Sequence, residues 1–321
     1  MSSDGKWITG LTAPVELVEA ARRVFQARLG IVRQQVTQML HGEPSDIEAV
    51  HQLRVATRRA GASLELFADC VPPRRYKTAR KLLRRLRRAA GAVRDWDVFT
   101  EMLGDWMQTQ RPECEQAGLD FLLGYSQGQR QAGLTALAKV LAKQAPRVPA
   151  VVADLIHSVQ PPRDGAAQTL CESAQQHLRG LLTELDEAIH ARPSDFEHLH
   201  QIRIIAKRLR YAIEIFADLY APELREQLYP AIVQAQELLG SVNDSHVAVQ
   251  RLATVQAEVA ARLPSRSARL QPGLAALRAY HEARLGQAGA EFARWCDQWQ
   301  SLIAQYPPTE LLAVGLSLGS D

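Results

Sequence analysis

Two segments of this chain repeat one another at a separation of 149 residues, and this repetition limits what the chain can fold into. Residues 44–59 read PSDIEAVHQLRVATRR, and residues 193–208 read PSDFEHLHQIRIIAKR. Extending the comparison without a gap to residues 44–98 and 193–247 gives 17 identical positions out of 55. We therefore expect an internal duplication, with one structural unit used twice and the two copies packed about a pseudo-twofold axis.

Apolar residues follow the helical period along most of the chain, and no segment shows the alternation of a strand. Aromatic residues make up only 6% of the chain, which also favours helices over sheets. The sequence therefore predicts an all-α fold of two tandem four-helix-type bundles. We expect a first helical repeat at about residues 12–157, a linker at about 158–165, a second repeat at about 166–306 and a C-terminal tail at 307–321.

The first copy contains clear helix start and stop signals. Ser45 or Asp46 is placed to cap a helix that should end near DCVPP at residues 69–73. A third helix is expected from about Arg74 to Ala90, where Gly91 would break or bend it before VRDWDV begins the next one. Asp95 would then cap that next helix. Alternatively, Asp95 and its counterpart Asp244 would each hold an Arg or His of the repeated helix in position.

The repeated helix separates into an apolar stripe, expected to be the core seam, and a polar stripe beside it. The apolar stripe comprises Leu53, Thr57, Ala60, Leu64 and Phe67, with Ile202, Ala206, Leu209, Ile213 and Phe216 in the second copy. The polar stripe comprises His51, Arg54, Arg58, Gly61 and Glu65, with His200, Arg203, Lys207, Arg210 and Glu214 in the second copy. Because the polar stripe is repeated as faithfully as the core, we interpret it as a functional surface. The alternative is a merely solvated face.

Positive charge is concentrated in the first copy. The whole chain carries +3, whereas the segment from His51 to Val98 has thirteen Arg or Lys against four Asp or Glu. Eight cations lie between Lys77 and Arg94 without a carboxylate, so the third helix gains stability when an anion neutralises it. Arg supplies 32 of the 38 cations, and its guanidinium matches phosphate oxygens in pairs. The pattern predicts an anionic partner.

The two repeated histidines could be structural, contact an anion or bind a metal. Metal binding is the least favoured, because His198 and His200 are two residues apart and do not share a helical face. Asp95 with Asp97 would make a poor catalytic pair, because the second copy carries His246 in place of the second acid. No phosphate-binding glycine loop or nucleophile elbow is present. We therefore expect no catalytic residue, no metal and no cofactor.

The cysteines, the N-terminal residues and the apolar segments indicate the cellular compartment of the protein. Its four cysteines are scattered without a CxxC pair, as in proteins that keep reduced thiols. The first residues lack the apolar core of a signal peptide, and no apolar run is long enough to span a membrane. We expect a cytoplasmic protein without membrane association; the oligomeric state is left open.

Together these residues resemble one known family. The pattern VHQLRVATRRAGASLELF followed by AGAVRDWDVF, with its echo LHQIRIIAKRLRYAIEIF followed by LGSVNDSHV, resembles the CHAD domain, the conserved-histidine α-helical domain, over roughly residues 12–306. The resemblance implies two helical bundles with a basic groove or pore between them. It further implies non-catalytic binding of inorganic polyphosphate and association with polyphosphate granules.

The resemblance also implies which residues bind. Carried over position by position, the polyphosphate-binding residues are expected to be His51, Arg54, Arg58, Arg59, Lys77, Lys81, Arg84, Arg88, Arg94, His200, Arg203, Lys207, Arg208 and Arg210. The chain departs from the family pattern at Gly61, where Arg is common, and at Asn243 and His246, which replace an Arg and an Asp. The late motif of the second copy is therefore the weaker one.

Two other functions compete with polyphosphate binding. A single-stranded nucleic-acid binder could use the same cations, but few aromatic residues lie near them: Tyr76, Trp96 and Tyr211. We therefore expect nucleic acid not to be the partner. The second alternative is a metal-dependent phosphohydrolase built from His51, His200 and the Asp motif.

Overall fold

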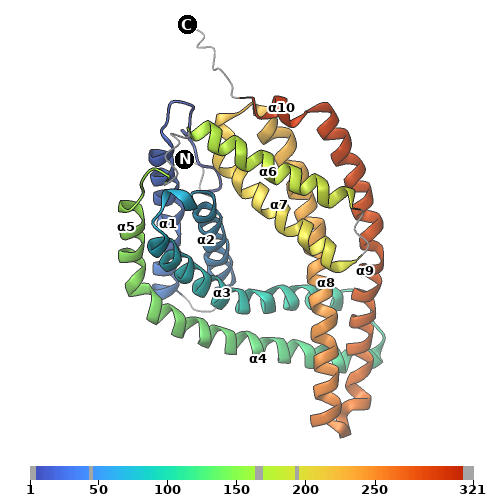
Figure 1. The fold of residues 1–321 in the computed structure, drawn as a ribbon. Helices are drawn as coiled ribbons and strands as arrows, with labels where there is room; N and C mark the ends of the chain where they lie inside the picture. Colours follow the sequence, from blue (N-terminus) through green and yellow to red (C-terminus); the bar gives the residue numbers. More distant parts are fainter. Residues whose placement is uncertain (1–4, 43–45, 163–168, 192–194, 314–321) are drawn as a thin grey trace.

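The computed structural model describes residues 5–42, 46–162, 169–191 and 195–313, and this part of the chain is helical with no strand. The predicted all-α class is therefore confirmed (Figure 1). The α-helices are α1 (Leu17–His41), α2 (Ile47–Leu66), α3 (Pro73–Met107), α4 (Glu113–Gln144), α5 (Val148–His157), α6 (Leu170–His190), α7 (Phe196–Phe216), α8 (Tyr229–Arg262), α9 (Pro264–Gln305) and α10 (Pro308–Leu311). The short connecting turns are η1 (Ala68–Cys70), η2 (Ala145–Arg147), η3 (Ala217–Leu219) and the π-helical η4 (Leu224–Leu228).

The repeated segments start their helices in the same way. The Asp46 side chain accepts hydrogen bonds from the backbone N–H groups of Glu48 and Ala49 at the start of α2. Asp195 accepts one from His198 at the start of α7. These caps satisfy amide groups that have no partner within the helix. Asp46 is thus the cap, while its alternative, Ser45, lies outside the described residues.

The expected break at Gly91 is wrong. Helix α3 runs without interruption from Pro73 to Met107, and α8 likewise continues through the equivalent Gly240. One glycine costs a helix only about 1 kcal/mol, and the surrounding Ala, Leu and Arg residues are strong helix formers. Asp95 therefore lies inside α3, so the expectation that it caps a new helix is also wrong.

Gly91 has a packing role instead. A Cβ atom at this position would lie 2.4 Å from Nη1 of Arg54, a residue of α2. The missing side chain therefore lets the Arg54 guanidinium cross closely over α3. At Gly240 a Cβ atom would meet no neighbouring atom within 4 Å.

The two parts of the chain share one main core. Both apolar stripes are buried as predicted, with every one of their residues at most 1% exposed. The same cluster continues through residues of every helix from α1 to α10 and does not divide at the expected linker. Of that linker, residues 163–165 lie outside the described part, as do Pro44, Pro193 and residues 314–321 of the expected tail. The boundaries between repeats stay a prediction.

A second, smaller core forms where two long hairpins cross. The hairpin of α3 and α4 runs across the hairpin of α8 and α9, which projects beyond it (Figure 1). Phe99, Leu119, Leu252 and Leu274 are buried in this crossing, one from each helix. Helices α4 and α9 approach so closely that a Cβ atom on Gly118 would lie 2.2 Å from the backbone oxygen of Leu270.

No helix in the described part of the chain combines the length and apolar character needed to cross a membrane.

Candidate anion-binding cleft

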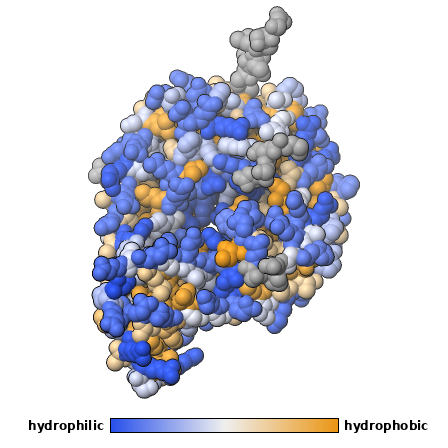
Figure 2. All heavy atoms as spheres, turned by 180° about the vertical axis from the view of Figure 1, so that it is seen from behind, coloured by the Kyte–Doolittle hydropathy of each residue, from blue (hydrophilic) through white to orange (hydrophobic). Residues whose placement is uncertain are grey.

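Two adjoining cavities lie between α2, α3, α7 and α8. One, of about 410 Å³, is lined by His51 and is called here the His51 cavity. The other, of about 650 Å³, is lined by Lys207 and is called the Lys207 cavity. They share Arg54, Arg58 and Asp95 as lining residues, so we treat them together as the cation cleft. Viewed from behind, the molecule is hollowed near its middle, where hydrophilic residues predominate (Figure 2).

Four predicted cations meet in this cleft. Arg54 and Arg58 are one turn apart on α2, and Arg203 and Lys207 are one turn apart on α7, so each pair projects from one helical face. Burial lowers the pKa of Lys207 to about 7, with Arg203, Arg58 and Arg54 adding to the shift. Burial and the neighbouring cations also lower the pKa values of Arg58 and Arg203. The cleft therefore holds positive charge that the protein does not fully compensate.

Three of these four cations have no ion pair among the described residues. The Nε atoms of Arg58 and Arg203 are buried without a hydrogen-bond partner in that part of the chain. Asp244 of α8 favours the charged forms of Arg203 and Lys207, but forms no ion pair with them within 4.0 Å. Buried polar groups in proteins nearly always have partners. An anion in the cleft would supply the missing acceptors.

Arg54 is the exception, because it has a carboxylate partner. Its Nη2 atom lies 3.5 Å from Oδ1 of Asp95 on α3. The alternative role predicted for Asp95, holding an arginine of the repeated helix in position, is therefore confirmed. The neighbouring Asp97 lies on another side of α3, is buried, and pairs with Arg130 of α4. The two acids do not form a pair.

The two repeated histidines occupy different surroundings. His51 lines the His51 cavity, and burial together with Arg94 lowers its pKa below 6.5. The uncharged imidazole is therefore favoured, and it can take part in hydrogen bonds at the wall of the cleft. His200 is half-buried beside Phe196 and lines neither cavity of the cleft. The described residues contain no cluster of three His, Cys, Asp or Glu side chains suited to a metal.

Arg59 and Arg210 lie in an internal charge network centred on Glu214. The Glu214 side chain is fully buried, and its carboxylate lies 2.9 Å from Nε of Arg59 and 3.2 Å from Nε of Arg210. Arg28 of α1 approaches to 3.8 Å, and the Tyr229 hydroxyl donates a hydrogen bond of 2.9 Å. Both predicted binding residues are thus engaged within the fold, and neither lines the cation cleft.

The basic residues of α3 divide into two groups. Arg88 lines the Lys207 cavity and Arg94 lines the His51 cavity. Lys77, Lys81 and Arg84 are exposed and line neither cavity. By helical period they lie on the side of α3 that carries Arg88, one to three turns toward its N-terminus. They extend the positive surface away from the cleft.

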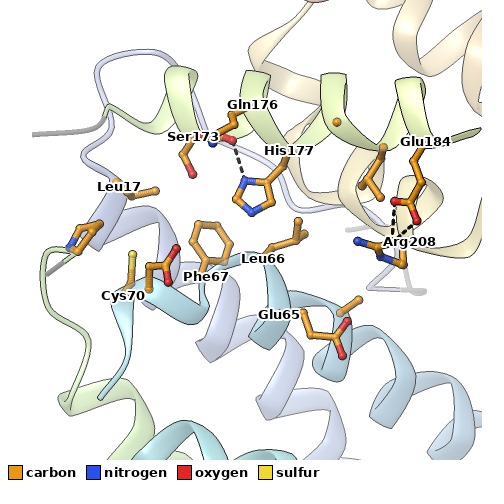
Figure 3. A pocket seen from close by; sticks show the side chains of 15 residues that line it. Leu17, Glu65, Leu66, Phe67, Cys70, Ser173, Gln176, His177, Glu184 and Arg208 are labelled. Atoms are coloured by element: carbon orange, nitrogen blue, oxygen red, sulfur yellow. Dashed lines mark hydrogen bonds and ion pairs between the residues drawn. The ribbon is translucent and has the colours of Figure 1, made fainter. Parts of the chain in front are cut away.

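Where the Lys207 cavity adjoins a third cavity, at Arg208 and Glu65, the lining is no longer mainly positive. Arg208 lines the Lys207 cavity and also a third cavity of about 470 Å³ next to Phe67, and it pairs with Glu184 at 2.8 Å (Figure 3). This Phe67 cavity is also lined by Glu65 and Asp69. Its carboxylates make it a poor continuation for a polyanion.

The cleft-lining residues missing from the prediction include Arg87, Arg251 and Tyr211. Arg87 lines the Lys207 cavity and could have been found from its place in the basic run of α3. Arg251 lines the His51 cavity but follows the repeated segment, so comparing the copies could not reveal it. Tyr211 lines the Lys207 cavity, and its buried hydroxyl has no partner among the described residues.

The fold and the cleft define a class of protein: all-helical, with cations of α2 and α7 that lack ion-pair partners lining a cleft between the helices. The CHAD domain model matches residues 24–253, well over half of the chain, and the protein belongs to the CHAD domain family. No curated protein sequence matches it significantly.

Solved structures with a similar fold include one from a plant and one from a bacterium of the genus Streptomyces. A crystal structure of the CHAD domain from the plant Ricinus communis has a TM-score of 0.67 at 23% identity, covering 92% of this chain and 94% of that chain. PptA from Streptomyces chartreusis has a TM-score of 0.66 at 17% identity, covering 89% of this chain and 100% of that chain. At these identities the likeness concerns the fold alone.

Proposed function

We propose that this protein binds inorganic polyphosphate in the cation cleft without catalysing a reaction on it. The observation that carries the proposal is the meeting of Arg54 and Arg58 with Arg203 and Lys207, three of which have no ion pair among the described residues. Polyphosphate is a flexible chain with about one charge per phosphate, so a row of guanidinium groups is its natural complement. The family resemblance implies the same ligand.

The surroundings of the aromatic residues favour polyphosphate over nucleic acid. Binding of single strands relies on aromatic faces on which bases stack. The Trp96 ring is already covered by the Arg251 guanidinium at 3.8 Å, and Tyr211 is only 4% exposed. Tyr211 therefore exposes almost no surface to a base, and one face of the Trp96 ring is already occupied. A ligand that has phosphates and no bases needs no such face.

We further propose that binding attaches the protein to polyphosphate granules in the cytoplasm. A granule presents many chains at high local concentration, so one cleft of moderate affinity is sufficient for retention. The exposed cations of α3, including Lys77 and Arg84, would contact the same chain where it leaves the cleft. Localisation of a fluorescent fusion in cells with and without granules tests this step.

A salt titration of polyphosphate binding tests the proposed ligand. If about six phosphates are contacted, the logarithm of affinity should fall with that of salt concentration at a slope of roughly −4. We expect Arg54→Ala and Arg203→Ala each to weaken binding about tenfold, in the range of a lost charge-assisted contact. Arg278→Ala is the control, because Arg278 is half-buried on α9, pairs with Glu282 and lines neither cavity of the cleft.

Competition and turnover distinguish the alternatives. Single-stranded RNA at equal charge should displace polyphosphate poorly, and preferential binding of RNA would contradict the proposal. If the protein released phosphate from polyphosphate in the presence of Mg²⁺ or Mn²⁺, and the His51→Ala variant did not, the protein would be a phosphohydrolase and the proposal would be wrong. Affinity that does not change with salt would exclude the cleft mechanism.

A further inference from the structure

Lys207 differs chemically from every other residue that lines the cation cleft. Among the described residues lining the His51 and Lys207 cavities it is the single lysine, and therefore the single primary amine. It is half-buried on α7 and has no hydrogen bond or ion pair within the described part of the chain. An arginine in its place would carry charge but could not act as a nucleophile at neutral pH.

Charged groups from four helices surround this amine. Arg54 and Arg58 of α2 and Arg203 of α7 disfavour its charged form, while Asp244 of α8 favours it. Arg87, Arg88 and Asp95 of α3 line the same cavity. Burial and the cations prevail and bring the pKa of Lys207 to about 7, so near neutral pH about half of the amine is unprotonated. A desolvated lysine beside other cations is a common form of activated nucleophile.

We propose that Lys207 is a modification site that accepts an acyl group from a small acyl phosphate held in the cation cleft. The phosphate of the reagent would lie against the guanidinium group of Arg58, which lines both the His51 cavity and the Lys207 cavity and has no ion pair among the described residues. This places the adjoining carbonyl carbon within the same cavity as the amine. Because both reactants are held in one cavity, the reaction becomes effectively unimolecular and is faster than a chance encounter in solution.

The reaction balances without any further reagent. The lone pair of the neutral amine attacks the carbonyl carbon and forms a C–N bond. The bond between that carbon and the bridging oxygen breaks, and inorganic phosphate leaves with the electron pair. The proton lost by the nitrogen passes to the departing phosphate or to water. The product is an uncharged amide at Lys207.

Acylation would alter the cleft in a defined way. It removes the positive charge that Lys207 carries when protonated and puts a neutral acylamide in the Lys207 cavity. This consequence rests on the proposed polyphosphate binding, whereas the acylation itself requires only a phosphate group in the cleft. Acylated protein should bind polyphosphate several-fold more weakly, and bound polyphosphate should protect Lys207 from acylation.

The test uses acetyl phosphate on the full chain at pH 7 and low salt, with initial rates at each lysine measured by peptide mass spectrometry. Lys77 and Lys81 are exposed in the basic stripe of α3, and Lys139 and Lys143 are exposed on α4, so the chain carries its own controls. We expect Lys207 to react on the order of tenfold faster than these four. Pyrophosphate should suppress its reaction selectively. Equal rates at Lys207 and at these four exposed lysines would overturn the proposal.

A second reagent separates phosphate recognition from simple nucleophilicity. Phenyl acetate carries the same acyl group without a charge. Arg58→Gln should slow the labelling of Lys207 by acetyl phosphate more than labelling by phenyl acetate. An equal loss with both reagents would show that no phosphate is recognised. Because no polyphosphate is present, these outcomes are independent of whether polyphosphate is the ligand.

Discussion

At the scale of single residues, equivalent positions of the two repeated sequence segments have different roles. Glu214 is buried among three arginines, whereas its counterpart Glu65 is exposed. An exact twofold arrangement would pair Arg208 with Glu65 as Arg59 pairs with Glu214, but Arg208 pairs with Glu184. The buried ion-pair network therefore forms around Glu214 and not around Glu65. The space beside Glu65 is the Phe67 cavity.

Replacing Glu214 tests this difference. We expect Glu214→Gln to lower the free energy of unfolding by about 3 kcal/mol or more, because Arg28, Arg59 and Arg210 lose their shared counter-charge. Chemical denaturation monitored by circular dichroism measures the change. Glu65→Gln is the matched control and should change stability by less than about 0.5 kcal/mol. Similar losses in the two variants would contradict the assignment of Glu214 as the centre of the network.

Lys207 gives stability a defined pH dependence. Its amine has an ordinary pKa of 10.5 in the unfolded chain and about 7 in the folded protein. Between these values the unfolded state binds more protons, so this residue makes the protein more stable as pH rises from about 7 toward 10. Lys207→Met should abolish that rise and weaken polyphosphate binding. Thermal unfolding across this pH range checks it; an unchanged profile in the variant would assign the dependence to another group.

At the scale of helices, the uninterrupted α3 sets the geometry of the cleft. Gly91 lets Arg54 lie across the helix and reach Asp95 one turn further on. Neither helical periodicity nor the glycine itself indicates this, because a glycine can equally end a helix or accommodate a neighbour. Only the contact between α2 and α3 distinguishes the two roles.

Gly91→Ala separates these roles experimentally. The added methyl group displaces the flexible Arg54 guanidinium, so we expect polyphosphate affinity to fall several-fold. Stability should change little, since the helix gains up to about 1 kcal/mol from alanine while the Arg54 contact is lost. Gly240→Ala, at the equivalent position without a close neighbour, should stabilise the protein and leave binding unchanged. Calorimetry of unfolding and of polyphosphate binding measures both quantities.

Sequence reasoning predicted the helices and the cation stripes but not which faces meet. The period of α2 places Arg54, Arg58 and Arg59 near one another, yet it cannot show that Arg59 alone faces Glu214, which is 155 residues away. For the same reason Arg210 was expected in the cleft. Such pairings depend on how whole helices cross, and helical periodicity within a segment carries no information about that.

At the scale of the whole molecule, the crossing of α4 and α9 fixes how the two long hairpins sit. Gly118 and Gly273 face each other there, and a Cβ atom on either would lie 2.2 Å from a backbone oxygen of the other helix. Backbone atoms cannot give way as a flexible side chain can. The two helices must therefore stay at this separation, which also holds α3 and α8 around the cation cleft.

A methyl group at this crossing tests its importance. Gly118→Ala should destabilise the protein by about 1–3 kcal/mol, because the added atom forces the helices apart. Gly124→Ala on the same helix meets no atom within 4 Å and should be neutral or stabilising. Denaturant titration measures both variants. A stabilised Gly118→Ala would mean that the helices are free to separate.

The main core, which runs through both copies without a division, affects any attempt to split the chain. Although the sequence suggests a cut near residue 160, either fragment alone would expose the apolar face that the other normally covers. We therefore expect residues 1–160 and 161–321, produced as separate polypeptides, to be largely unfolded alone and to become helical when mixed. Circular dichroism of the fragments before and after mixing would show this complementation. If so, this fold would provide a two-part reporter whose assembly restores the proposed polyphosphate site.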